Sequence, residues 1–415
     1  MGNVKIKYSY GFQYIYTLVL NFLLVAVVFD NFRQVIGIPL VLHTVISLFR
    51  DLFLFFLIMC IYLSPEKKIS SLFLFVVLLF TPVPVVIFLY NAFFYISETT
   101  LGNVTKGIYW TLRPLLLLFI LNNSDKLYLY TKNETVKLFV VSAAIMFFLS
   151  LGIYIKFPYV LTAKYYENRI SVGNPSMIAT VYIAAIILLL KYKPFNRLLN
   201  FFLFFILTVA CVFTLTATAI TILFLIIGIN FFSNENRWAS VSIVVFSLPI
   251  VLFVLLTVNL SKLILYFDFF LSRITEITSV LQKYILNQTD LINSDSIRGR
   301  EVQVKNFISS FPQINFIFGG GDISGTGGKY SLENTYYALF SNYGLFGVCL
   351  YLFFLLRLLL SAVKSFYRMH DVNLINYLVF LILYGMTLDL INTFSLSSTF
   401  IVVGYYVTRR RDEIK

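Results

Sequence analysis

Three polar segments contain the residues whose types are best suited to chemistry. Arg169 lies in YYENRISVGNPSMIAT, Arg298 and Arg300 lie in DSIRGREVQVKNF, and Glu333 and Asn334 lie in SLENTYYALFSNYGLFG. A guanidinium group stays charged and binds phosphate oxygens through two parallel N–H groups. Two converging arginines would therefore suit a diphosphate. The alternative is that they are ordinary interfacial cations, and we favour that alternative for Arg298 alone.

Glu333 admits two roles. Its carboxylate can act as the general base for an incoming hydroxyl, or it can complement the dipole of a helix that starts nearby. Asp322, in the glycine-dense string FGGGDISGTGGKY, is a weaker candidate for the base. Gly319, Gly320 and Gly321 allow that string to approach a ligand closely or to move. The later GTGGKY is not a phosphate-binding P-loop, because it lacks both the first glycine and the Ser or Thr that binds magnesium.

The sequence predicts no metal site and no cofactor. His43 and His370 are the only histidines, and neither has a Cys, His or carboxylate partner at ligand spacing. Cys60, Cys211 and Cys349 each lie in an apolar run and behave as small hydrophobic residues. The formal net charge is +13, but most cations occupy short loops, which argues against nucleic-acid binding.

The composition is that of a membrane protein. Hydrophobic residues make up 59% of the 415 residues and charged residues only 12%, against about 25% charged in a soluble domain. Apolar runs of about 20 residues can each cross the hydrocarbon core of a membrane. They predict one all-α membrane domain over 1–415 with about twelve spans, at 11–29, 44–63, 69–90, 107–121, 138–155, 176–190, 198–213, 217–232, 239–260, 334–356, 374–389 and 393–408. The run 198–232 is divided at its polar notch, TLTATA.

Lysine and arginine in the short loops predict the orientation. With twelve spans, the basic clusters near residues 67, 132, 193, 364 and 410 all fall on one side. That side is expected to be the cytoplasm, and both termini lie there. The loop 261–333 then lies outside, and its length marks it as functional or disordered. Apolar residues at helical spacing over 270–284 and 304–311 favour amphipathic helices at the membrane surface, with Arg300 on the apolar stripe of the second.

These features together resemble the O-antigen polymerase family (Wzy) and the related O-antigen ligases, which are glycosyltransferases of bacterial surface polysaccharide assembly. Three patterns carry the resemblance: Arg169 with Gly173, then Gly299 with Arg300 followed by FGGG, and finally ENTYYALFSNYGLFG. Length, span count and the long outward loop also fit.

The resemblance implies a GT-C-like fold in the bacterial inner membrane and a metal-independent polymerase that acts on undecaprenyl-pyrophosphate-linked oligosaccharides, with a chain-length regulator as a further partner. It implies that Arg169 and Arg300 bind the pyrophosphate, and that Asn334, Gly344 and Gly347 shape the following helix. Two departures matter. Relatives often have a Ser-Arg pair in the notch, where this chain has TATA from Thr216 onward, and the ligase has a histidine at the position of Glu333. The missing histidine counts against a ligase.

A flippase or small-molecule transporter is the alternative from another class, because about twelve spans is a common number for transporters. Transporters often have internal repeats and helices broken at the membrane midplane. The sequence contains no such repeat, and its informative polar residues cluster at one surface. These observations favour the polymerase.

Overall fold

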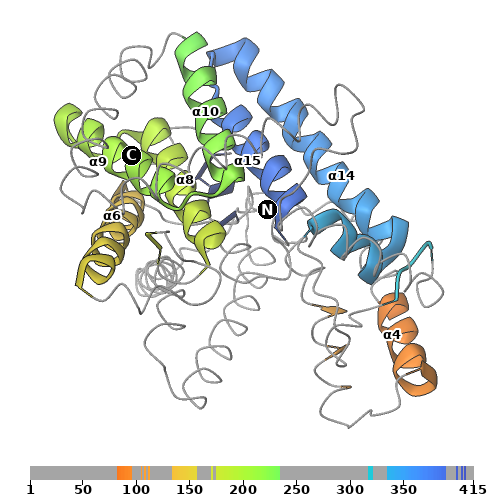
Figure 1. Ribbon diagram of the computed structural model, residues 1–415. Helices are drawn as coiled ribbons and strands as arrows, with labels where there is room; N and C mark the ends of the chain where they lie inside the picture. The colour runs from red at the N-terminus through yellow and green to blue at the C-terminus, as the bar shows by residue number, and fades with distance from the viewer. Residues whose placement is uncertain are drawn as a thin grey trace, which may run out of the picture.

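Seven helices make up the regular structure of the part that the computed structural model describes (Figure 1). The described residues are 82–95, 104, 107–108, 111–112, 133–156, 170–171, 174–233, 316–320, 334–388, 399–400, 403–404 and 406–407. The helices are α4 (Pro82–Tyr95), α6 (Asn133–Lys156), α8 (Pro175–Tyr192), α9 (Arg197–Phe213), α10 (Ala217–Phe232), α14 (Thr335–Met369) and α15 (Asn373–Thr387). Within these residues the fold is all-helical, as predicted.

Polar side chains fix the helix ends. Asn174 caps α8, with its side-chain oxygen accepting from the backbone N–H of Ser176 at 3.0 Å, and Pro175 takes the first helical position, where a missing N–H costs nothing. Asn196 caps α9 by accepting from Leu199 N–H at 2.8 Å. Lys193 closes α8 in the left-handed region (φ 46°). These caps allow α8 and α9 to reverse direction over a short connection.

The helix α8 is the centre of the bundle. It packs against α6, α9, α10 and α15, and its side chains are buried from Ile178 to Tyr192. A helix that is apolar on all sides belongs in such a position. At its end, the Lys191 ammonium donates to the Val407 carbonyl and the Tyr192 hydroxyl donates to the Tyr406 carbonyl. Residues 406 and 407, the last that the structure describes, are thereby bonded to the end of α8.

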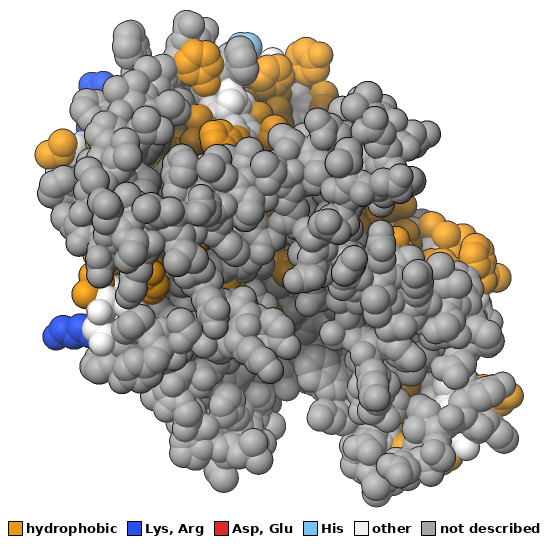
Figure 2. Space-filling view, viewed as in Figure 1, with side chains coloured by type: hydrophobic (Ala, Val, Ile, Leu, Met, Phe, Trp, Pro, Cys, Tyr) orange, Lys and Arg blue, Asp and Glu red, His pale blue; other side chains and the backbone are white. Residues whose placement is uncertain are grey.

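Helices at the edge of the bundle expose large apolar side chains. Examples are Phe148 on α6, Phe202 on α9 and Leu360 on α14, which are 52%, 56% and 63% exposed. Hydrophobic side chains also reach the surface in Figure 2. Large apolar surfaces of this kind suit contact with lipid. Among the described residues, three helices are long and apolar enough to cross a membrane, over Glu134–Lys156, Pro175–Tyr192 and Thr335–Arg368, and four shorter apolar helices accompany them.

The predicted spans agree closely with α8, α9, α10 and α15, and α9 and α10 divide at the predicted notch. The prediction for α14 was too short: the helix continues 13 residues past 356, to Met369. Its extension carries Arg357, Lys364 and Arg368 on exposed positions, so it is helical without being apolar throughout. Predicted spans 11–29, 44–63 and 239–260 lie outside the described residues, as do the amphipathic helices predicted in 261–333.

Candidate functional site

Three of the nine predicted site residues are described: Gly319, Gly320 and Asn334. The other six, which are Arg169, Arg298, Arg300, Gly321, Asp322 and Glu333, lie outside the described residues. Gly319 and Gly320 belong to a joint in which the segment Phe316–Gly320, from the predicted long loop, meets a break in α14, and Asn334 lies at the start of the same helix.

The break in α14 lies at Gly344, whose backbone has φ 61° and ψ −153°. In an uninterrupted helix, the N–H of Leu345 would donate to the carbonyl of Ser341, and Phe346 to Asn342. Here Leu345 N–H donates to the Phe316 carbonyl at 2.9 Å, and Phe346 N–H to the Ile317 carbonyl at 3.0 Å. In return, Gly320 N–H donates to the Ser341 carbonyl at 2.8 Å. The segment therefore satisfies polar groups that the break releases.

Glycine is required on both sides of this contact. Gly319 has φ 75°, and a Cβ there would lie 2.3 Å from the backbone of Asn342 and Tyr343. A Cβ on Gly344 would lie 2.5 Å from the carbonyl carbon of Ile317. Both the positive φ and the close approach exclude a side chain. The close approach predicted for the glycine-dense loop is thus made, at Gly319, to the backbone of α14.

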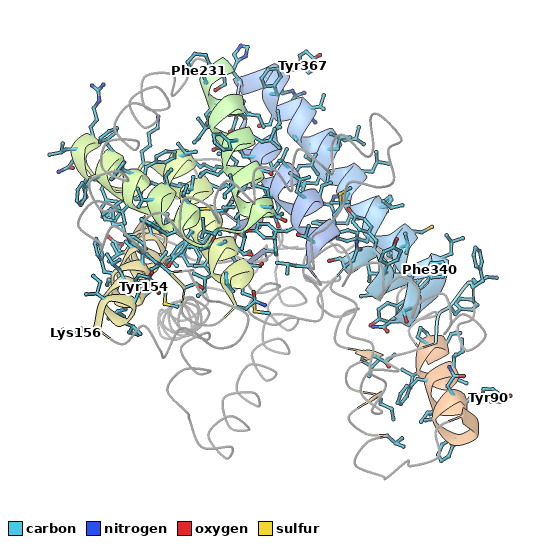
Figure 3. All side chains as sticks on the ribbon, viewed as in Figure 1. Tyr90, Tyr154, Lys156, Phe231, Phe340 and Tyr367 are labelled. Carbon is cyan, nitrogen blue, oxygen red and sulfur yellow. The ribbon has the colours of Figure 1, made fainter. Side chains whose placement is uncertain are left out.

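Two further hydrogen bonds connect the joint to residues earlier in the chain. The Asn91 side chain of α4 donates from Nδ2 to the Gly320 carbonyl at 3.2 Å. The hydroxyl of Tyr343, the last residue before the break, donates to the Thr111 carbonyl. Figure 3 shows α4, with Tyr90, beside the end of α14 that carries Phe340. Asn91, Thr111 and residues 316–320 therefore all contact α14 or its partner segment near the break.

Asn334 is the N-cap of α14 and also joins it to α15. Its Oδ1 accepts from the N–H groups of Tyr336 at 2.9 Å and Tyr337 at 3.3 Å, and its Nδ2 donates to the Met386 carbonyl at 2.9 Å. The neighbouring Thr335 hydroxyl donates to the Leu388 carbonyl at 2.7 Å. Both polar atoms of the Asn334 amide thus have protein partners. Asn334 thus caps α14, and Gly344 interrupts it.

Gly320 and Asn334, the described residues on either side of 321–333, both lie close to the first part of α14. Gly320 is bound to Ser341, and Asn334 lies seven residues earlier on the same helix, about 10 Å along its axis.

A second contact involves the residue that follows Arg169. Ile170 N–H donates to the Phe213 carbonyl at 3.2 Å, at the turn between α9 and α10. In that turn Leu215 has φ 50°, a strained value for a residue other than glycine, and the Thr214 and Thr216 hydroxyls are 3.2 Å apart. The sequence suggested both the arginine segment and the polar notch, but nothing in it indicated that they adjoin. Ile170 and the notch come together because α8, which follows Ile170, packs against α9, which ends at the notch.

The described side chains are those of a positioning framework. Backbone carbonyls, amides and hydroxyls hold segments in place, and nowhere in the described ranges do three His, Cys, Asp or Glu side chains come together as a metal site would require. No protein-family model and no curated protein matches the chain.

Proposed function

We propose that this protein is a polymerase of bacterial surface polysaccharide, which joins undecaprenyl-pyrophosphate-linked oligosaccharide units at the periplasmic face of the inner membrane. The observation that carries the proposal is the joint between Phe316–Gly320 and the break in α14. It anchors residues 316–320, which belong to the predicted outward loop, to a helix that is long and apolar enough to cross a membrane. Non-helical backbone at membrane depth is tolerated where protein buries it or where it lines a polar cavity.

The chemistry follows from the substrate. A lipid pyrophosphate is already a good leaving group, so the enzyme mainly has to stabilise the negative charge that develops on it. Arg169 and Arg300 would supply fixed positive charge for this purpose. A sugar hydroxyl of a second lipid-linked unit attacks the anomeric carbon, with Glu333 as the base and Asp322 as the weaker candidate for that role.

The contact between Ile170 and Phe213 supports a fixed position for the first arginine segment. A guanidinium that stabilises charge in the transition state must be held before the reaction begins, since reorganisation would cost energy. The residue after Arg169 is bound to a buried turn between two helices. This arrangement suits a residue that positions a diphosphate.

The break in α14 also favours a second candidate, a transporter or flippase of lipid-linked units, because broken helices often form the binding sites of transporters. Gly344 lies nine residues after Thr335, in the half of the apolar stretch nearer the end capped by Asn334. A site near one surface suits a polymerase better than a transporter, whose site lies near the midplane.

The lipopolysaccharide ladder on a gel separates these functions after deletion of the gene. A polymerase deletion leaves core carrying a single repeat unit, a ligase deletion leaves core with none, and a flippase deletion causes lipid-linked units to accumulate inside the cell. We expect the first pattern. The second or third would replace the proposal.

Arginine variants test the site. Arg300→Ala and Arg169→Ala are each expected to abolish long chains while the protein still inserts into the membrane. Arg197→Ala, at an exposed position in the first turn of α9, is the matched control and should leave the ladder unchanged. A normal ladder from either site variant removes that arginine from the mechanism.

A further inference from the structure

The second part of α14 carries three cations on one face. Arg357, Lys364 and Arg368 are all exposed, and they follow one another at intervals of seven and four residues. With about 100° of rotation per residue, this spacing places the three side chains within about 40° of one another around the helix. The sequence of α14 contains no acidic residue. The three cations therefore form a positively charged stripe, which we call the cationic stripe.

An apolar stripe of exposed side chains runs beside the cationic stripe. Its members recur at intervals of three and four residues, and they are 43% to 79% exposed. They are Phe353, Leu356, Leu360, Val363 and Tyr367. The helical period puts them about 80° from the cations. On the other flank of the cations, Phe354, Leu358 and Ala362 are buried in the core. The cationic stripe therefore lies between the buried face of α14 and an exposed apolar face.

The two stripes end together at the C-terminal end of α14. Lys364 and Arg368 lie on either side of Tyr367 in the sequence, and Figure 3 shows Tyr367 at that end of the helix. Tyrosine is enriched where a membrane meets water. From Tyr367 the apolar stripe runs back to Phe353, which is about 21 Å along the axis toward the middle of a helix that is long enough to cross a membrane. A phospholipid has the same order, with its charged headgroup at the interface and its acyl chains parallel to a spanning helix.

The carboxylate nearest in the sequence is engaged at the start of α15. Asp371 accepts from the backbone N–H of Asn373 at 2.9 Å and from its Nδ2 at 2.6 Å. An acidic peptide in the aqueous phase would satisfy the cations but would not cover the apolar stripe. Ammonium and guanidinium groups form charge-assisted hydrogen bonds with phosphate. We propose that Lys364 and Arg368 bind the phosphate group of an anionic phospholipid, whose acyl chains lie along the apolar stripe.

Native mass spectrometry of the full chain in a neutral detergent tests the headgroup site, with phosphatidylglycerol and phosphatidylcholine as the added lipids. We expect the wild-type protein to bind phosphatidylglycerol more tightly. Lys364→Gln/Arg368→Gln should weaken that binding roughly 10-fold or more, because both cations that attract the phosphate are lost. The two positions are exposed, so Tm should stay unchanged and show that the variant folds.

A second double variant is the matched control for this experiment. Lys193→Gln/Arg197→Gln also removes two exposed cations four residues apart, but these lie between α8 and α9 and not beside the apolar stripe. Its affinity for phosphatidylglycerol should equal that of the wild-type protein. An equal loss in both double variants would mean that the lipid responds to net charge alone, and it would overturn the proposal. Equal affinity of the wild-type protein for the two lipids would overturn it as well.

Quenching of tryptophan fluorescence by brominated lipids tests the apolar stripe. We compare Leu360→Trp with Phe202→Trp, at an exposed position on α9, in phosphatidylcholine nanodiscs with a small fraction of phosphatidylglycerol, after subtraction of the wild-type signal. When phosphatidylglycerol carries the bromine, Leu360→Trp should be quenched several-fold more strongly. When phosphatidylcholine carries it, Leu360→Trp should lose this excess. Equal quenching of the two variants by brominated phosphatidylglycerol would contradict the proposal. Neither measurement depends on the polymerase activity.

Discussion

Gly319 and Gly344, on different segments, share one backbone contact in the joint. Alanine at either position meets a positive φ and a backbone atom closer than any real Cβ approaches. We expect Gly319→Ala and Gly344→Ala each to destabilise the protein by about 1–3 kcal/mol or more, and to lower Tm accordingly. Under the proposed polymerase function, both variants should lose long chains as well.

Two other glycines provide the matched control for this prediction. Gly152 in α6 and Gly228 in α10 have open space around the Cβ position. Alanine there should leave Tm unchanged or raise it, because alanine stabilises a helix by about 1 kcal/mol relative to glycine. Equal effects from all four alanine variants would show that the joint has no special requirement for glycine.

Asn334 performs two structural tasks that substitutions can separate. Asn334→Ala removes both the cap and the bond to Met386, and should cost about 1–2 kcal/mol. Asn334→Asp retains an oxygen that caps Tyr336 and Tyr337 but loses the donor to Met386. Its unfolding free energy should therefore fall between that of the wild-type protein and that of Asn334→Ala. Chemical denaturation in detergent measures the order. An aspartate variant as unstable as the alanine variant would mean that the cap contributes nothing.

The segment Phe316–Gly320 depends on α4 as well as on α14. Asn91→Ala removes the donor to the Gly320 carbonyl, and we expect faster hydrogen exchange at Gly320, Leu345 and Phe346, whose N–H groups form the joint. Amides in α8, far from this bond in the sequence, should be unaffected. Uniform acceleration across the protein would indicate global destabilisation and contradict a local role for Asn91.

The helices were predictable where the apolar period was clear, and their contacts were not. The apolar run 198–232 and its polar notch were enough to delimit α9 and α10. The break at Gly344 could not be derived from periodicity, because the apolar residues continue on both sides of it. Its cause is a segment that is distant in the sequence and supplies replacement hydrogen bonds. The joint therefore exists only in three dimensions.

The candidate site was predictable only in part for a related reason. Gly319 and Asn334 were identified from their residue types, but their partners are backbone atoms of Asn342 and Met386, which carry no signal in the sequence. Asn91 and Thr111 were not singled out at all, since a single amide in an apolar helix resembles many others. The arginines rest on residue chemistry and on the family resemblance alone.

For the molecule as a whole, sidedness is the prediction on which the function depends. Lys193 and Tyr367 are exposed and are expected on the cytoplasmic side, and Lys156 is exposed and expected outside. In Figure 3, Tyr367 and Phe231 lie together at one end of the described part, and Lys156 lies toward the other. When intact cells are treated with an impermeant maleimide, a single cysteine at 156 should be labelled, and single cysteines at 193 and 367 should not.

A cysteine at 300 completes that experiment and should be labelled together with the cysteine at 156. Labelling of residue 300 only after the cells are broken would exclude an extracytoplasmic diphosphate site. The proposed polymerase would then be wrong.

The bonds from Lys191 and Tyr192 to Val407 and Tyr406 also constrain the order in which the protein is made. Val407 is separated from Lys191 by 216 positions, so the end of α8 is synthesised long before its acceptor. During translation, this ammonium must be accommodated by water, lipid headgroups or the insertion machinery. The native arrangement at this end of α8 is completed only when residue 407 has emerged from the ribosome, so biogenesis of the bundle finishes late.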